Sequence, residues 1–290
     1  AGLFEIATIG GIAGGFSLGG WLWRELGTAR KLAGIPFTSP AFAANSFLYV
    51  LSFCVLFWGM RAISDRRSVS SAPSLLQRYR QILGNRRILE FAPAWIAINA
   101  VLGIWINVTA RLLTDKMGFP GQLLVGHLSS FQAGNARAAY AVLFIVGILL
   151  WSLLSPKIRR NTAMLIGVAG LLVSCLLLFL INHQGAWNAQ SIIPLAAGLG
   201  LSIMVQSGFT PAALAHLADL TEVHRNDRGA VMGLYSVFLG LGQLFGAVIG
   251  GVFVDRWGAD GMVLITGLLG VFAGLLVLRL TKTEPANGSS

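Results

Sequence analysis

About eight stretches of mostly apolar residues, each long enough to cross a bilayer as a helix, run through this chain of 290 residues. Backbone polar groups inside hydrocarbon must find their partners within their own segment, so each stretch is predicted to be a helix. The stretches are residues 3–23, 41–60, 91–113, 137–154, 162–182, 191–217, 229–254 and 259–280. An alternative start of the fourth stretch lies within residues 123–131. The predicted fold class is therefore an all-α polytopic membrane protein.

The composition supports this class and argues against a nucleic-acid-binding protein. Hydrophobic residues make up 55% of the chain and charged residues only 11%, whereas soluble proteins are about 25% charged. The formal net charge is +10, but the basic residues lie between and beside the apolar stretches. We therefore interpret them as topology signals and as contacts with anionic lipid headgroups.

The Lys and Arg residues also predict an orientation. With Ala1 on one side of the membrane, that side receives about twice as many Lys and Arg residues as the other side. Positive residues favour the cytoplasmic side, so both ends of the chain are predicted to be cytoplasmic. The expected location is the plasma (inner) membrane, with several passes across it.

The longest connection, residues 61–90, is basic and predicts a boundary between two helical units. Residues 1–60 then hold the last two helices of an N-terminal bundle. Residues 91–280 form a six-helix C-terminal bundle, and residues 281–290 form a polar cytoplasmic tail. Within the linker, apolar residues from Leu75 to Leu83 have the spacing of a helix that lies on a surface.

A glycine pattern, G-x-x-x-G-x-x-x-G-G, occurs twice. On a helix, residues four apart share one face, so each copy predicts a stripe where another helix packs closely. The first copy contains Gly11, Gly15, Gly19 and Gly20, and the second contains Gly242, Gly246, Gly250 and Gly251. Generic packing of small residues is the alternative interpretation.

The two glycine copies, the linker and the charge distribution together resemble the major facilitator superfamily of secondary transporters. Its antiporter branch carries G-x-x-x-G-P-x-x-G-G in the fifth helix, and here Phe16 and Ala247 stand at the proline position. The resemblance implies twelve helices in two six-helix halves. This chain would correspond to helices five to twelve. About four N-terminal helices of the same protein, not included in this sequence, would then be its packing partners.

The resemblance also implies a function. The protein would transport a small solute by alternating access, as efflux or uptake, and protons are the candidate coupling ion. The alternative is a complete eight-helix membrane enzyme or lipid-handling protein. Neither a catalytic constellation nor a nucleotide loop is found in the sequence, and no cofactor and no metal are expected.

Polar residues within the apolar stretches are the candidate site, because such groups are costly in a membrane unless they meet water, solute or a partner. Those expected to face a solute cavity are Asn99, Trp105, Asn107, Gln206, Thr210 and Gln243. For Asn99 and Asn107, hydrogen bonding between helices is an equal alternative. Pro211 follows Thr210 and predicts a kink in that helix.

Two further sets of charged residues are candidates. Proton coupling needs a titratable group, and the candidates are Glu5 and Asp255. The polar turn after residue 217 predicts a cytoplasmic gate of salt bridges, which we favour over a metal site there. Its residues are Asp219, Glu222, Arg225 and Arg228.

Overall fold

The computed structural model describes residues 2–26, 31–32, 35–36, 40–62, 86–154, 158–220 and 228–283. Its elements are α1 (Gly2–Leu26), β1 (Lys31–Leu32), β2 (Ile35–Pro36), α2 (Pro40–Ala62), α4 (Arg86–Asn107), α5 (Thr109–Thr114), α6 (Ser130–Leu154), α7 (Arg160–Asn182), α8 (Ala189–Gln206), α9 (Phe209–Leu220) and α10 (Arg228–Thr283). Among these described residues, six helical stretches are long and apolar enough to cross a membrane. The prediction of a polytopic helical membrane protein is confirmed.

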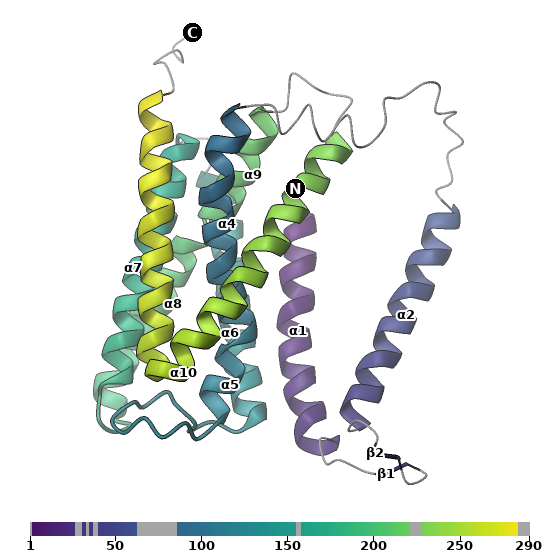
Figure 1. Ribbon diagram of the computed structural model, residues 1–290, viewed down its shortest axis with the longest axis vertical. Helices are drawn as coiled ribbons and strands as arrows, with labels where there is room; N and C mark the ends of the chain where they lie inside the picture. The colour runs from purple at the N-terminus through teal and green to yellow at the C-terminus, as the bar shows by residue number, and fades with distance from the viewer. Residues whose placement is uncertain are drawn as a thin grey trace.

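The longest of these stretches, Gly233–Thr281, is a hairpin rather than one span. Gly258 interrupts α10 with φ 62° and ψ −136°, a conformation that glycine adopts without a Cβ clash. Figure 1 shows the first arm of α10 crossing the bundle and the second arm returning beside α7. We call the end of the bundle at Gly258 the hinge end and the opposite end, where α4 begins, the terminal end.

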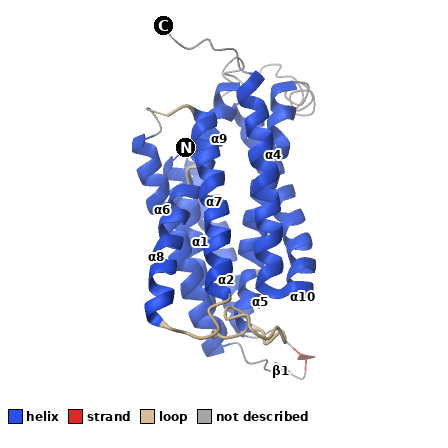
Figure 2. Cartoon of the chain, turned by 90° about the vertical axis from the view of Figure 1, so that its left-hand side faces the viewer, coloured by secondary structure: helices blue, strands red, loops and turns tan. Residues whose placement is uncertain are grey.

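Helices α4 to α10 form a bundle whose main core lies between α4, α7, α9 and the second arm of α10. Ala94, Met164 and Val277 are completely buried there. A second core lies at the hinge end, where α4 and α5 meet both arms of α10. Figure 2 shows these helices running side by side along the long axis.

The first two helices are placed differently. Helix α1 packs along α6, whereas α2 makes few contacts and stands apart in Figure 1. The most apolar 18-residue window of α2 is 0% buried, and large side chains such as Phe47 and Trp58 are exposed. The face of α2 is thus available to lipid or to other helices.

A short antiparallel strand pair lies in the connection between α1 and α2. Lys31 lies opposite Pro36, and Leu32 lies opposite Ile35. The sequence analysis did not predict strands here. Two residues per strand are too few to give an alternating pattern.

Several predicted helix boundaries need correction. Helix α4 begins at Arg86 rather than at residue 91, and Arg86 Nε forms an ion pair with Glu90 Oε1 at 2.8 Å in its first turn. Residues 63–85, with the amphipathic segment around Leu75, lie outside the described residues. The division into two bundles and a tail stays a prediction.

The fourth span begins seven residues earlier than its predicted start at residue 137. Helix α6 starts at Ser130, and a reciprocal cap precedes it. The Ser129 backbone N–H donates to Gln132 Oε1 at 2.9 Å, and the Gln132 N–H donates to Ser129 Oγ at 3.3 Å. This is a capping box, S-x-x-Q, and it places Arg137 inside the helix.

Candidate functional site

The second glycine copy forms the seam between α10 and α4. Its three residues in this contact are Gly242, Gly246 and Gly250. At Gly246 an added Cβ would lie 2.6 Å from the carbonyl carbon of Ala100, so only glycine permits this approach. Gly251 differs, because a Cβ there would meet no described atom within 4 Å.

The seam also receives a glycine from α4. A Cβ on Gly103 would lie 2.6 Å from the Cα of Gln243, so the backbones are in contact. The half-buried Gln243 thus lies on the seam through its main chain. On α10, Gly242 lies against Asn99, with only 2.6 Å between its added Cβ and the Asn99 Cβ.

The first glycine copy packs in another way. Only Gly20 is in a close contact, where its added Cβ would be 2.7 Å from the Ser130 carbonyl oxygen and 3.4 Å from the Cα of Gly134. This contact joins α1 to α6. The other three glycines, Gly11, Gly15 and Gly19, face no described atom within 4 Å.

A polar and aromatic layer crosses the bundle near the middle of α6. The Trp105 ring of α4 stacks on the Tyr140 ring of α6, with centroids 5.6 Å apart and an interplanar angle of 11°. The Gln206 side chain of α8 donates a hydrogen bond to the Tyr140 hydroxyl at 2.9 Å. Helices α4, α6 and α8 therefore meet through a ring stack and a hydrogen bond.

This layer contains polar atoms whose bonding capacity is not used within the described part of the chain. They are Trp105 Nε1 and Gln206 Oε1, both buried. A buried polar atom without a partner costs about 1–3 kcal/mol. Such atoms are therefore suited to bind a polar ligand or water.

The two asparagines of α4 do not share one environment. Asn99 is 1% exposed and donates to the Trp95 carbonyl at 2.8 Å. Asn107 is exposed and donates to the Gly103 carbonyl at 2.9 Å. Both side chains thus bond to their own helix, and they point to different surroundings.

The kink predicted at Pro211 lies earlier, between α8 and α9, at Ser207 and Gly208. The Trp151 side chain of α6 donates through Nε1 to the carbonyls of Met204 and Val205, at 3.2 and 3.1 Å. Trp151 thus adds a donor to two carbonyls at the break, which also accept from Ser207 Oγ and from the Gly208 N–H. Pro211 lies in the first turn of α9, where a missing N–H costs little, and Thr210 beside it is half-buried.

Arg137 of α6 belongs to this region, and the sequence analysis treated it only as a topology charge. Its Nη2 donates to the Ile106 carbonyl at 2.7 Å, at the end of α4. Its guanidinium carbon lies 3.7 Å from the centre of the Phe16 ring of α1. Arg137 therefore connects three helices, one turn from Tyr140.

The coupling candidate Asp255 lies at the hinge end. Its Oδ1 is 2.9 Å from Arg111 Nη1, and both side chains are about half exposed (55% and 56%). The ion pair joins α5 to the first arm of α10. The other candidate, Glu5, lies on α1, and its side chain is outside the described residues.

A polar network beside Gly258 binds the loop after α5 to α10. Asp260 accepts from Asn182 Nδ2 at 3.0 Å and from Gln122 Nε2 at 3.1 Å. The Gln122 side chain also accepts from the Ala259 N–H at 2.8 Å. His183 Nε2 lies 3.4 Å from Asp260.

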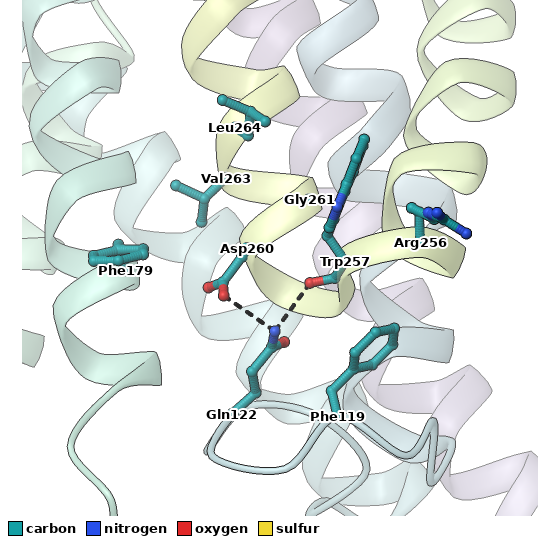
Figure 3. Close-up of a pocket in the computed structure, with 9 residues that line it drawn as sticks. All are labelled: Phe119, Gln122, Phe179, Arg256, Trp257, Asp260, Gly261, Val263 and Leu264. Atoms are coloured by element: carbon teal, nitrogen blue, oxygen red, sulfur yellow. Dashed lines mark hydrogen bonds between the residues drawn. The ribbon is translucent and has the colours of Figure 1, made fainter.

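Figure 3 shows a pocket at this hinge end, with a volume of about 480 Å³. Gln122, Asp260 and Arg256 contribute its polar groups, and aromatic residues such as Phe119 and Trp257 contribute apolar wall. The pocket lies far along the bundle from Gln206. It is therefore distinct from the polar layer.

At the terminal end, one predicted gate residue can be placed with a partner. Asp219 of α9 forms an ion pair with Arg160 of α7. Arg228 begins α10, but its side chain is outside the described residues, as are Glu222 and Arg225. Within the described segments, no group of three or more His, Cys, Asp or Glu residues could hold a metal ion.

Comparison with known proteins agrees with this architecture. The sequence model of the Major Facilitator Superfamily matches residues 123–290. The chain is also similar to the chromaffin granule amine transporter of Homo sapiens, with 32% identity over 159 residues. That alignment covers 54% of this chain and 28% of the relative, so the chain corresponds to only part of the relative's length. This multi-pass membrane chain belongs to the Major Facilitator Superfamily of transport proteins.

Proposed function

We propose that this chain forms part of a secondary carrier that moves a small organic solute by alternating access. The observation that carries the proposal is the layer formed by Trp105, Tyr140 and Gln206. It lies near the middle of membrane-spanning helices, and it contains buried polar atoms without partners. Carriers of this type bind solute near the midplane.

The helix break next to the layer supports the same function. Gln206 is the last residue of α8, and Ser207 and Gly208 separate it from α9. Discontinuous membrane helices supply backbone groups and flexibility at the binding sites of carriers. A change in solute occupancy at Gln206 can thus act directly on the α8–α9 joint.

The contact between α1 and α6 supports relative motion of two bundles. It rests on the approach of Gly20 to Gly134 and on Phe16 beneath Arg137. We propose that α1 and α2 belong to the N-terminal half. The further helices of that half would cover α2 and the open glycines of the first copy.

The proposal also includes the coupling ion, the orientation of the chain in the membrane and the membrane in which it lies. Glu5 and Asp255 are the candidate proton-carrying groups, and both ends of the chain are placed in the cytoplasm below a plasma membrane. The surplus of Lys and Arg on that side would contact anionic headgroups. A protonated amine is one candidate solute, because the relative is named as an amine transporter.

The test is solute flux in proteoliposomes that contain the full-length protein, with and without a pH gradient. We expect Gln206→Ala to lower the initial rate about tenfold or more, since truncation of one buried hydrogen-bond partner costs about 1–3 kcal/mol. Ser152→Ala, an exposed residue at the end of α6, is the matched control. Unchanged flux in Gln206→Ala at equal protein abundance would remove the layer from the solute pathway.

A further inference from the structure

The charge of Arg137 is not balanced by any carboxylate that the structure describes. The carboxylates whose side chains the structure describes form contacts with basic side chains other than Arg137. The pairs are Glu25 with Arg24, Glu90 with Arg86, Asp115 and Asp255 with Arg111, Asp219 with Arg160, and Asp260 with His183. An arginine inside a membrane-spanning helix is costly without such a partner.

Arg137 lies within helix α6 rather than at its end. It lies seven residues inside the span Ser130–Leu154, which is about 10 Å along the helix at 1.5 Å per residue. Its Nε is buried and has no hydrogen-bond partner among the described residues. A positive charge with unused donor capacity therefore lies within a helix that is long and apolar enough to span a membrane.

The surroundings of Arg137 supply the other parts of a binding site. The Phe16 ring covers one side of the guanidinium, and the Ile106 carbonyl fixes Nη2. The next residue toward the bundle centre on α4, Trp105, has a buried indole N–H without a partner among the described residues. A second donor thus belongs to the residue next to Ile106, and Tyr140, one turn from Arg137 on α6, accepts from Gln206.

We infer that Arg137 is the anion-binding residue of the solute site and that the transported solute carries a carboxylate or a similar oxyanion. A planar guanidinium binds such a group through two parallel hydrogen bonds. The anion would supply the charge that the described protein lacks near Arg137. The same positive charge disfavours a protonated amine at this position. The inference rests on the proposed function.

The experiment measures uptake by the full-length protein in proteoliposomes of three solutes of similar size: benzoate, benzamide and benzylamine. We expect the wild-type protein to transport benzoate in preference to the other two. Arg137→Gln should lower the benzoate rate at least about tenfold, because one charge-assisted interaction with the carboxylate is lost. The benzamide rate should not change. Arg137→Lys should retain part of the benzoate rate, because lysine keeps the positive charge but lacks the planar guanidinium that forms two parallel hydrogen bonds.

Arg159→Gln is the control, because it removes the same charge from an exposed position at the start of α7. It should leave the benzoate-to-benzamide ratio unchanged. Preference for benzylamine or benzamide, or an unchanged benzoate rate in Arg137→Gln, would overturn the inference and leave the carrier function intact. Failure to transport all three solutes would overturn the proposed function together with the inference.

Discussion

Gly246 of α10 lies against the backbone of Ala100 in α4, and a Cβ added to it would fall 2.6 Å from the Ala100 carbonyl carbon. Neither backbone can move without disturbing a completely buried neighbour, Ile104, on the same seam. The seam therefore fixes the first arm of α10 against α4. Helix α4 also carries Trp105, a residue of the polar layer.

Gly246→Ala is expected to destabilise the protein by about 1–3 kcal/mol, because an extra methyl group in a close-packed seam forces the backbones apart. The measurement is the thermal unfolding midpoint of the purified protein in detergent. Gly251→Ala is the matched control on the same helix, since its Cβ meets no described atom within 4 Å. It should be neutral or raise stability by about 0.5–1 kcal/mol. Equal effects of both changes would contradict the seam.

Gly258→Ala is expected to cost about 1–3 kcal/mol, because a side chain would be strained at this positive φ. Its Cβ would also lie 2.9 Å from Cδ2 of Phe119 and would overlap the Gln122 side chain. Gly267→Ala, where the added Cβ has open space, is the control. Thermal unfolding of both variants checks this prediction, and a stable Gly258→Ala protein would show that the hinge does not need glycine.

Trp151→Phe is expected to destabilise the break between α8 and α9. The change keeps most of the ring volume but removes the N–H that binds the Met204 and Val205 carbonyls. The Met204 carbonyl keeps Ser207 Oγ at 2.8 Å and the Val205 carbonyl keeps the Gly208 N–H at 3.2 Å, so the expected cost is that of a lost hydrogen bond, about 0.5–1.5 kcal/mol. Trp187→Phe, at an exposed position, removes one indole without this effect and serves as the control. If the two variants unfold at the same temperature, Trp151 does not support the break.

The helices of this protein could be predicted from the sequence because span length and hydropathy are local properties. The second glycine copy predicted close packing for the same reason, since spacing of four defines a helix face. The sequence did not tell which helix each stripe would meet. That partner depends on the whole bundle, so Gly11, Gly15 and Gly19 could not be distinguished from Gly246 by their pattern.

The start of α6 illustrates what hydropathy misses. Residues 130–136 are too polar to extend the apolar stretch, so hydropathy alone predicts that Arg137 is a flanking charge. The capping box of Ser129 and Gln132 was the signal that could have shown the earlier start. The contacts of Arg137 with Phe16 and Ile106 could not be read from the sequence, because they join segments far apart along the chain.

The final prediction separates a solute site from ordinary packing in the polar layer. Tyr140→Phe should lower stability by about 1–3 kcal/mol, because the Gln206 amide loses its acceptor. Adding Gln206→Leu removes both polar groups, and such a double replacement is close to neutral for stability. Solute flux should stay low in the double variant, because the Tyr140 hydroxyl and the Gln206 amide are no longer present to bind the solute.

The matched control is the buried hydroxyl pair of Ser174 and Ser202, whose oxygens are 2.7 Å apart between α7 and α8. The double change Ser174→Ala and Ser202→Ala should keep both stability and flux. Thermal unfolding and proteoliposome uptake, measured on the same preparations, give the two readouts. If flux recovers together with stability in Tyr140→Phe/Gln206→Leu, the layer only packs the bundle, and the solute must bind elsewhere.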